Sequence, residues 1–278
     1  MKNLKKYGFN TNKKVYSIAE IGINHNGQFD KAIKLVDSAL KTGVNAVKFQ
    51  TYITEKRVNK NSGIFEILKR CELSFKEFQK INEYCYEKKI DFFSTPFDLE
   101  SLDFLISLNI PHIKIASFDS INEKFLESIS KSKKNLILSI GMSNLIEIQN
   151  AYNILTKHGS ILSLLHCISS YPTKEIDTNL SAIYSLKKNF DCVVGYSDHT
   201  NGIKAPLYAI AAGAQIIEKH YKINDTMDCV DSAVSINENQ MKKMIEEINV
   251  LENILGEEKL ELRPTEIGTK IFRRFSKI

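Results

Sequence analysis

The chain has 278 residues, with 38 Lys and Arg against 33 Asp and Glu, and a formal net charge of +5. This mild positive charge suits an anionic small substrate, but it is too weak and too dispersed to indicate a nucleic-acid-binding protein. Hydrophobic residues make up 43% of the chain, yet its apolar runs are no longer than a strand, which excludes a transmembrane helix. The start of the chain lacks the apolar region of a signal peptide, and we therefore expect a cytoplasmic protein.

Eight short β-rich segments follow one another along the chain at regular spacing. Helix-like segments separate them, such as residues 30–43 and 74–89, the second of which begins with a capping box formed by Ser74 and Glu77. The predicted strands are residues 15–22, 46–50, 91–97, 112–117, 135–141, 161–167, 192–198 and 215–221.

A last amphipathic helix follows the eighth strand and stops at Gly256. Eight strands, each followed by a helix, predict an α/β fold of the (β/α)8 TIM-barrel type over residues 1–256. A doubly wound open sheet is the competing arrangement, but it usually has fewer strands and a glycine-rich first turn. Neither a dinucleotide-binding nor a Walker A pattern occurs, so no nucleotide site is predicted. The apolar face of the last helix consists of Met241, Met244, Ile245, Ile248, Leu251 and Leu255.

Two segments depart from the regular alternation. The connection 51–73 is long, is expected to lie over the active site, and contains a possible short helix at residues 62–73. The tail 257–278 is too short to be a domain, and we interpret it as a linker toward a further domain. The five cysteines are odd in number and form no C-x-x-C pair, so we expect buried reduced thiols rather than disulfides or a zinc ribbon.

Polar and charged residues gather at the carboxyl ends of the predicted strands. In a barrel this is the face that carries the active site. Buried charges cost several kcal/mol unless they are paired, so a purely structural barrel has no reason to collect them there. Among these residues are Glu20, Lys48, Gln50, Thr95, Lys114, Ser117, Asp119, Ser139, Ser169, Tyr171, Ser197, His199 and His220.

The segment YSDHT (196–200) places Ser197, Asp198 and His199 side by side. Because side chains alternate faces along a strand, these three cannot form a hydrolase triad. Asp198 is instead expected to orient a neighbouring side chain.

Histidines end two consecutive strands, His199 on the seventh and His220 on the eighth. Neighbouring strands are roughly 4.8 Å apart, so two imidazoles there can share one divalent cation. The alternative is a pair of packed, hydrogen-bonded structural histidines. His25 is a weaker third candidate ligand, whereas His112, His158 and His166 are interpreted as structural.

Two lysines, Lys48 and Lys114, end the second and fourth strands among hydroxyl groups. They predict a pocket for a phosphate and a carboxylate. The rival functional interpretation is a Schiff-base lysine of the aldolase kind.

Eight motifs in order, over about residues 15–275, resemble the sialic acid synthase family of N-acetylneuraminate, legionaminate and pseudaminate synthases. They are IAEIGINHNG (18–27), AVKFQTY (46–52), FFSTPF (92–97), IKIAS (113–117), ILSIGM (137–142), LLHCISSYP (164–172), GYSDHT (195–200) and IIEKHY (216–221).

The resemblance implies a metal-dependent transferase that condenses phosphoenolpyruvate with an N-acylated amino sugar, giving a nonulosonic acid and phosphate. The sugar would be N-acetylmannosamine or a 2,4-diacetamido-2,4,6-trideoxyhexose. It implies Mn²⁺ or Mg²⁺ on His199 and His220, and Glu20 as the group that handles protons and activates water. Phosphoenolpyruvate contacts would be Lys48, Thr95, Lys114, Ser117, Ser139, Ser169 and Ser197, and sugar contacts Gln50, Asp119, Tyr171 and Asp231.

The resemblance also implies a carboxyl-terminal antifreeze-like domain following the 257–278 linker, and a homodimer in which that domain completes the neighbouring site. Two other functions stay open. One is a lysine Schiff-base aldolase on the same barrel, and the other is a barrel that binds ligand without turnover when the second domain is absent. No membrane or nucleic-acid partner is expected.

Overall fold

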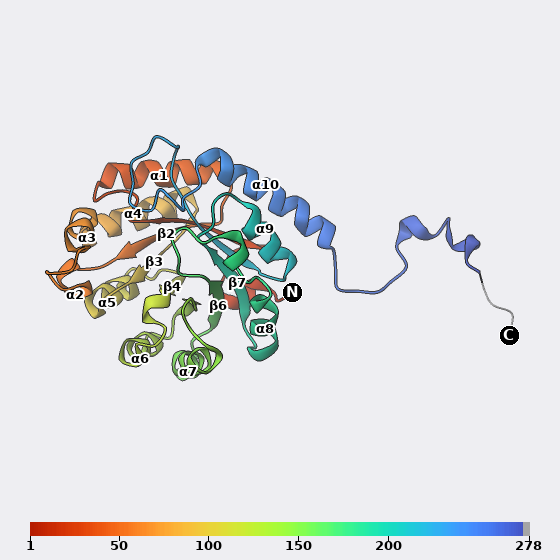
Figure 1. Ribbon diagram of the computed structural model, residues 1–278, viewed down its shortest axis with the longest axis horizontal. Helices are drawn as coiled ribbons and strands as arrows, with labels where there is room; N and C mark the ends of the chain where they lie inside the picture. Colours follow the sequence, from red (N-terminus) through yellow and green to blue (C-terminus); the bar gives the residue numbers. More distant parts are fainter. Residues whose placement is uncertain (275–278) are drawn as a thin grey trace.

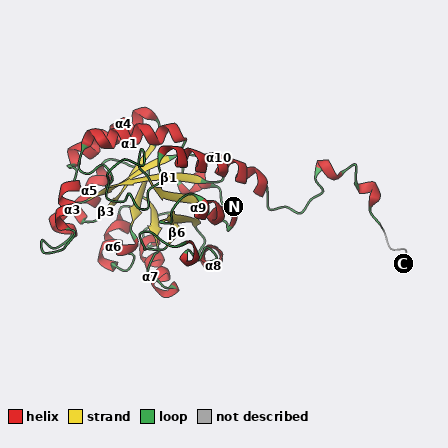
Figure 2. Ribbon diagram, turned by 45° about the horizontal axis from the view of Figure 1, so that its top comes forward, coloured by secondary structure: helices red, strands yellow, loops and turns green. Residues whose placement is uncertain are grey.

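A closed barrel of eight parallel strands, arranged in sequence order with β1 paired to β8, forms the centre of the molecule. This computed structural model describes residues 1–274. Figures 1 and 2 show the helices packed around the outside of the strands, which confirms the predicted (β/α)8 fold. The strands are β1 Tyr16–Gly22, β2 Ala46–Thr51, β3 Asp91–Pro96, β4 His112–Ile115, β5 Asn135–Ser139, β6 Leu162–Cys167, β7 Val193–Asp198 and β8 Ile216–His220.

The helices begin and end close to the positions that the sequence predicts. The Ser74 hydroxyl accepts a hydrogen bond from the backbone N–H of Glu77, whose carboxylate accepts one from the N–H of Ser74, so the predicted capping box is confirmed. The helices are α1 Phe29–Thr42, α2 Thr54–Arg57, α3 Phe65–Cys71, α4 Phe75–Lys88, α5 Leu99–Ser107, α6 Glu123–Lys131, α7 Leu145–Thr156, α8 Ala182–Asn189, α9 Lys204–Ala211 and α10 Glu238–Leu255.

The last helix buries its apolar face only along its first part. Met241 and Met244 are fully buried, and α10 ends at Leu255 before Gly256, as predicted. Leu255 itself is exposed, because the end of α10 runs past the body of the barrel, as Figure 1 shows. The predicted apolar face of α10 is thus buried at Met241, Met244, Ile245 and Ile248, and Leu255 lies at its exposed end.

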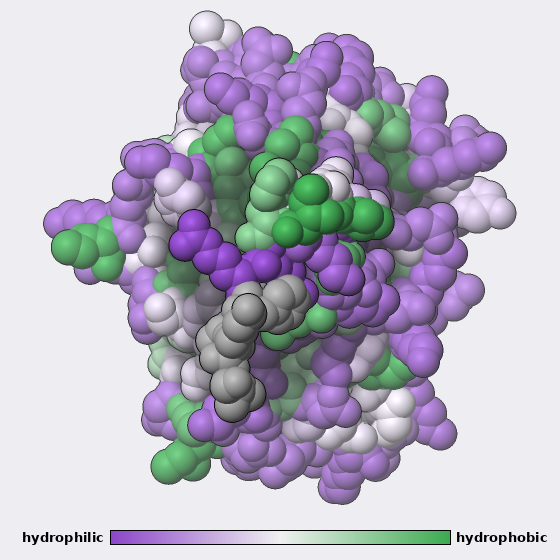
Figure 3. Space-filling view, turned by 90° about the vertical axis from the view of Figure 1, so that its right-hand side faces the viewer, coloured by the Kyte–Doolittle hydropathy of each residue, from purple (hydrophilic) through white to green (hydrophobic). Residues whose placement is uncertain are grey.

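The long connection 51–73 contains two short helices, of which only the second, α3, was expected from the sequence. The tail after α10 contains two single 3-10 turns, and its described residues 257–274 are largely exposed. It extends away from the barrel in Figure 1, and Figure 3 shows apolar side chains in the foreground on this side. Residues 275–278 of the predicted linker lie outside the described residues.

All five cysteines are buried and free, which confirms the prediction of reduced thiols. Within residues 1–274, no helix combines the length and the apolar character that crossing a bilayer requires.

Gly195 on β7 lies where the interior of the barrel leaves no room for a side chain. A Cβ atom there would come within 2.4 Å of the Ile216 carbonyl oxygen and 2.5 Å of a Leu165 methyl group. The backbone of β8 cannot withdraw without disturbing the ladder that carries the neighbouring strand.

We expect Gly195→Ala to lower the free energy of unfolding by about 1–3 kcal/mol, the usual cost of overpacking. Urea denaturation measures this change. Gly63→Ala is the matched control, since a Cβ there meets nothing within 4 Å. Equal stability of the two variants would contradict the close approach at Gly195.

His112 begins β4 at the amino end of the barrel, two residues before Lys114 of the polar site. Its ring stacks on Phe9 with centroids 4.2 Å apart, and Nε2 lies 3.1 Å from the Tyr7 carbonyl oxygen. Burial lowers the pKa of His112 to about 4. The histidine is therefore neutral and structural, as the sequence predicts.

This buried histidine makes stability depend on pH. The unfolded chain takes up a proton near pH 6.5 and the folded chain only near pH 4, so stability from this group is complete above pH 6.5 and falls as the pH drops toward 4. The loss over that window is about 3 kcal/mol. In His112→Gln this contribution is absent, so the gap in unfolding free energy between the two proteins should narrow by that amount between pH 7.5 and 4. A gap that stays constant in urea titrations would refute it.

Candidate active site

A cavity of about 220 Å³ opens at the carboxyl ends of the strands. On β2 and β8 the side chains that line it stand two residues apart, as alternation requires: Lys48 and Gln50, and Glu218 and His220. Of the residues predicted for the site, Asp119, Ser169 and the weaker candidate ligand His25 do not line it. The predicted residues in its wall are Glu20, Lys48, Gln50, Thr95, Lys114, Ser117, Ser139, Tyr171, Ser197, His199, His220 and Asp231.

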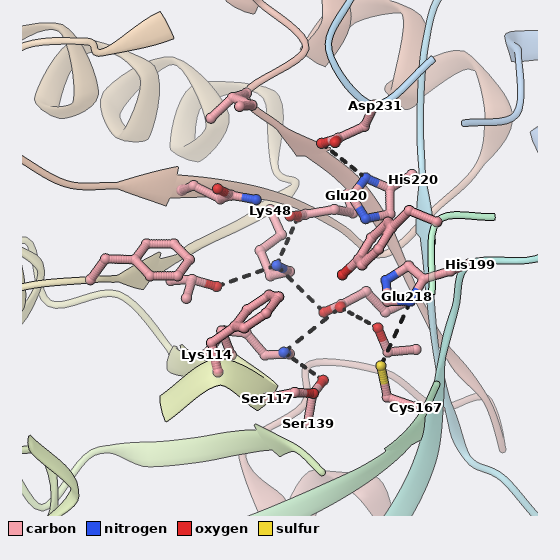
Figure 4. A pocket seen from close by; sticks show the side chains of 18 of the residues that line it. Glu20, Lys48, Lys114, Ser117, Ser139, Cys167, His199, Glu218, His220 and Asp231 are labelled. Carbon is pink, nitrogen blue, oxygen red and sulfur yellow. Dashed lines mark hydrogen bonds and ion pairs between the residues drawn. The ribbon is translucent and has the colours of Figure 1, made fainter. Parts of the chain in front are cut away.

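Two lysines and two glutamates form a buried chain of alternating charge across the floor of the cavity (Figure 4). Lys48 Nζ lies 2.9 Å from Glu20 Oε2 and 3.7 Å from Glu218 Oε2, and Lys114 Nζ lies 3.7 Å from Glu218 Oε1. Side-chain exposure does not exceed 6% for any of the four. Each buried charge is therefore stabilised by the opposite charges beside it rather than by water.

Burial and pairing set the protonation of this chain. Burial opposes ionisation of Glu218, but Lys114 and Lys48 outweigh it and lower the pKa of Glu218 to about 2. Burial raises the pKa of Glu20, and Lys48 offsets only part of that rise. The pKa of Lys114 is lowered, because burial lowers it more than the nearby Glu218 carboxylate raises it. Glu20 is thus the carboxyl group best suited to take up and release a proton.

Hydroxyl groups surround the two lysines. Thr95 accepts from Lys48 at 3.3 Å, Ser139 accepts from Lys114 at 2.7 Å, and Ser197 donates to Glu218 at 2.8 Å. These contacts arrange donors around a cationic centre, as an oxyanion ligand requires.

Beside these groups, Gly141 keeps two further hydroxyls close to its backbone. The N–H of Gly141 donates to the Ser117 hydroxyl at 2.9 Å, and a Cβ on this glycine would lie 2.3 Å from the Ser169 oxygen. The Ser169 hydroxyl is buried without a hydrogen-bond partner. Ser169 therefore lies against the cavity wall although it is not part of its lining.

His199 and His220 face one another across the cavity, with ring centroids 5.3 Å apart. His199 Nδ1 lies 2.8 Å from the Ile168 carbonyl oxygen, which can only accept, so Nδ1 carries the hydrogen in that bond and Nε2 keeps its lone pair. Burial lowers the pKa of His199 to about 4. Tyr171 covers this ring at a centroid distance of 4.1 Å.

His220 has a different electrostatic environment. Its Nδ1 lies 3.4 Å from Asp231 Oδ2 but is buried without a hydrogen-bond partner. Burial disfavours the charged ring, yet Asp231 outweighs it and raises the pKa of His220.

His199 fits a divalent cation, because a neutral imidazole with its second nitrogen fixed by an oxygen is the arrangement that metal-binding histidines adopt, and His220 would bring the second imidazole. Within residues 1–274 no group of three or more His, Cys, Asp or Glu side chains is placed to hold a metal ion. The protein would therefore supply two ligands, and water or substrate oxygens the others.

Three other predicted residues lie outside this arrangement. His25 is buried behind the cavity wall, where its Nδ1 accepts from the Gly27 N–H at 3.1 Å, so the structure does not bring it to the other two histidines. Asp119 lies in a 3-10 turn, Ser117–Asp119, next to the cavity. Asp198 faces outward from β7 and accepts from Lys219 at 2.7 Å, which matches the orienting contact predicted for it.

No role in the site was predicted for three polar residues of the wall: Glu218, Arg57 and Cys167. Glu218 could have been found, because it stands two residues before His220 on the same face of β8. Cys167 was considered only as a buried thiol, although its Sγ lies 3.8 Å from His199 Nδ1. Arg57 comes from α2, which no pattern predicted.

A closed (β/α)8 barrel whose strand ends meet in one cavity of paired lysines, glutamates and histidines belongs to the class of barrels with a single polar site at the carboxyl face. The chain belongs to the NeuB family, whose sequence model matches residues 35–260.

Two similar proteins and one solved structure illustrate the relationship. The chain is 45% identical over 242 residues to uncharacterized protein MJ1065 of Methanocaldococcus jannaschii, covering 87% of this chain and 72% of that protein. It is 36% identical over 262 residues to N,N'-diacetyllegionaminic acid synthase of Campylobacter jejuni, with 88% and 78% covered. The crystal structure of N-acetylneuraminic acid synthetase from Leptospira borgpetersenii, in complex with citrate, superposes with a TM-score of 0.91 at 40% identity, with 93% and 91% covered.

Proposed function

We propose that this protein condenses phosphoenolpyruvate with an N-acylated amino sugar, giving a nine-carbon nonulosonic acid and phosphate. The observation that carries the proposal is the buried Glu20–Lys48–Glu218–Lys114 chain, which lies directly below the paired histidines in one cavity. The family relationship supports the same reaction class, since named relatives are synthases of such sugar acids.

Phosphoenolpyruvate would bind over the lysines. Its phosphate and carboxylate would take hydrogen bonds from Lys48 and Lys114, with the hydroxyls adding donors. Both lysines already contact carboxylates. An entering anion would therefore replace Glu218 as the partner of the two lysine ammonium groups. The anion-binding groups are Lys48, Thr95, Lys114, Ser117, Ser139, Ser169 and Ser197.

The enol carbon C3 would attack the sugar aldehyde, forming the new C–C bond while the aldehyde oxygen takes a proton. Water adds to C2, and the C2–O bond to phosphate breaks. Glu20, with its pKa raised by burial, would remove the proton from that water. Mn²⁺ or Mg²⁺ held by His199 and His220 would polarise the aldehyde oxygen.

The sugar would lie above phosphoenolpyruvate, toward the mouth of the cavity. Gln50, Tyr171 and Asp231 line that part and offer hydrogen-bond donors and acceptors for its hydroxyls, and Asp119 lies just beside it. Asp231 would also orient His220, which it approaches to 3.4 Å.

Phosphate release from phosphoenolpyruvate, measured with a panel of N-acyl hexosamines with and without Mn²⁺, tests the proposal. We expect release with N-acetylmannosamine or with its 2,4-diacetamido-2,4,6-trideoxy relative, and loss of release with chelator. Phosphoenolpyruvate binding by calorimetry with no release from any sugar would instead indicate a ligand-binding barrel without turnover.

One observation favours a Schiff-base aldolase as a second candidate: burial lowers the pKa of Lys114, as an amine nucleophile requires. Borohydride reduction in the presence of pyruvate would then leave a stable adduct on Lys114 or Lys48, and chelator would leave activity intact. From the family resemblance we further propose that the protein is a cytoplasmic homodimer. Light scattering on the purified protein would test the dimer.

A further inference from the structure

Arg57, on the short helix α2, is the cation of the cavity wall that the function above does not use. Its guanidinium lies 3.6 Å from the ring centroid of Phe97 and 4.6 Å from that of Tyr52. Nη1 donates to the Gln50 side-chain oxygen at 3.1 Å. Two aromatic rings and one amide thus hold the plane of the guanidinium in place.

Unlike the two lysines, this guanidinium has no close anion. Among residues 1–274, no Asp or Glu oxygen forms an ion pair with Arg57 within 4.0 Å, and Gln50 is its one hydrogen-bond acceptor. Four of its five N–H groups are therefore available to a ligand. The side chain is half-buried and lines the cavity, so a ligand there can reach it.

The position of Arg57 assigns it to the second substrate. It contacts Gln50, which stands two residues beyond Lys48 on β2, roughly 7 Å further toward the mouth at the usual rise of a strand. Phosphoenolpyruvate lies at the level of Lys48, so the group that reaches Arg57 belongs to the acceptor sugar.

The surroundings favour a neutral oxygen over an anionic one. Asp231 lines the same cavity and Asp119 lies in the turn beside it, so an anionic substituent would meet two carboxylates. A carbonyl oxygen meets no such repulsion. Ile23, Phe97 and Phe118 line the same cavity and offer apolar contacts to a small alkyl group. A carbonyl that carries a methyl group matches both features.

We propose that Arg57 is a specificity-determining residue that donates to the amide carbonyl of an N-acyl group on the acceptor sugar, while the neighbouring apolar side chains receive the acyl methyl. This inference rests on the proposed function and extends it to the chemistry that selects the acceptor. Through its bond to the Gln50 oxygen, Arg57 also turns the Gln50 amide nitrogen toward the sugar, beside Gly22 and Asp231.

Steady-state phosphate release by the full chain and by Arg57→Leu tests the proposal. The acceptors are N-acetylmannosamine, its 2,4-diacetamido-2,4,6-trideoxy relative, N-acetylmannosamine 6-phosphate, and mannose, in which a hydroxyl replaces the N-acyl group. Hydrogen bonds to charged groups contribute about 1.5–3 kcal/mol, so we expect Arg57→Leu to raise KM for an N-acyl acceptor about 10- to 100-fold. KM for phosphoenolpyruvate should stay within about twofold, and the preference for the N-acyl sugar over mannose should fall by the same factor as the acceptor affinity.

Two variants serve as controls. Arg57→Lys keeps the charge but loses the planar fork, and should recover only part of the acceptor affinity. Lys56→Leu removes the adjacent cation, which is exposed and paired with Glu100 outside the cavity, and should leave both KM values unchanged. Thermal unfolding of each variant checks that the fold is retained.

An equal rise in KM for phosphoenolpyruvate and for the sugar would overturn the assignment to the acceptor. A loss confined to the 6-phosphate sugar would overturn it in favour of an anionic substituent. If the wild-type protein releases no phosphate with any sugar, the proposed function fails. Saturation-transfer NMR of the acyl methyl group then tests the contact between Arg57 and the N-acyl group without turnover. A methyl signal present with wild-type protein and lost with Arg57→Leu supports it, and equal signals refute it.

Discussion

Replacing His199 with alanine is expected to abolish metal-dependent phosphate release. His199 and His220 would be the two protein ligands of the cation, so removing one leaves a single imidazole. Loss of an outer-shell partner alone costs roughly 10- to 100-fold in metal affinity or activity, and loss of a ligand should exceed that range. Two measurements check it: phosphate release across Mn²⁺ concentrations, and Mn²⁺ binding by electron paramagnetic resonance, which reports the site without turnover.

His25→Gln is the matched control for this experiment. His25 is also buried near the carboxyl face, but it lies outside the cavity. The variant should retain Mn²⁺ binding and phosphate release to within about tenfold, since neither ring nitrogen of His25 reaches the site. Full activity in His199→Ala, with the fold intact by circular dichroism, would refute the metal assignment.

The fold could be predicted because periodicity and barrel geometry constrain each other. Eight strand-like segments separated by amphipathic ones allow few architectures, and the alternation of side chains then fixes which residues point inward. Glu20, Lys48 and Ser197 were predicted because the active site of a barrel lies at the carboxyl ends of its strands. Strand ends shifted by a residue or two, as between the predicted 112–117 and the observed His112–Ile115, without changing which face a residue occupies.

The parts of the site that escaped prediction depend on contacts rather than on position along a strand. Arg57 belongs to a four-residue helix in a loop, where no hydrophobic repeat can form. The ion pairs of Glu218 with both lysines join strands that are not neighbours in the barrel, so only the closed structure shows them. The separation of Asp198 from His199, adjacent in the sequence, follows directly from alternation and was predictable.

Breaking the pair between Lys219 and Asp198 is expected to be among the most destabilising single changes in the barrel. Both side chains are fully buried on the outer face of β7 and β8, 2.7 Å apart. Lys219 also donates to the Thr200 carbonyl oxygen, and Asp198 accepts from the Thr200 N–H at 2.9 Å and from the Tyr196 hydroxyl at 3.0 Å. This cluster ties the end of β7, which carries His199, to the end of β8.

We expect Lys219→Met to lower the free energy of unfolding by about 3–5 kcal/mol, because it leaves the Asp198 carboxylate buried without a countercharge. Urea denaturation measures the change. Lys204→Met removes an exposed pair with Glu175 and should cost less than about 1 kcal/mol. In the double variant Asp198→Asn/Lys219→Met the orphaned charge is gone, so part of the stability should return. A loss of less than about 1 kcal/mol in Lys219→Met would show that the pair contributes no more to stability than an exposed ion pair does.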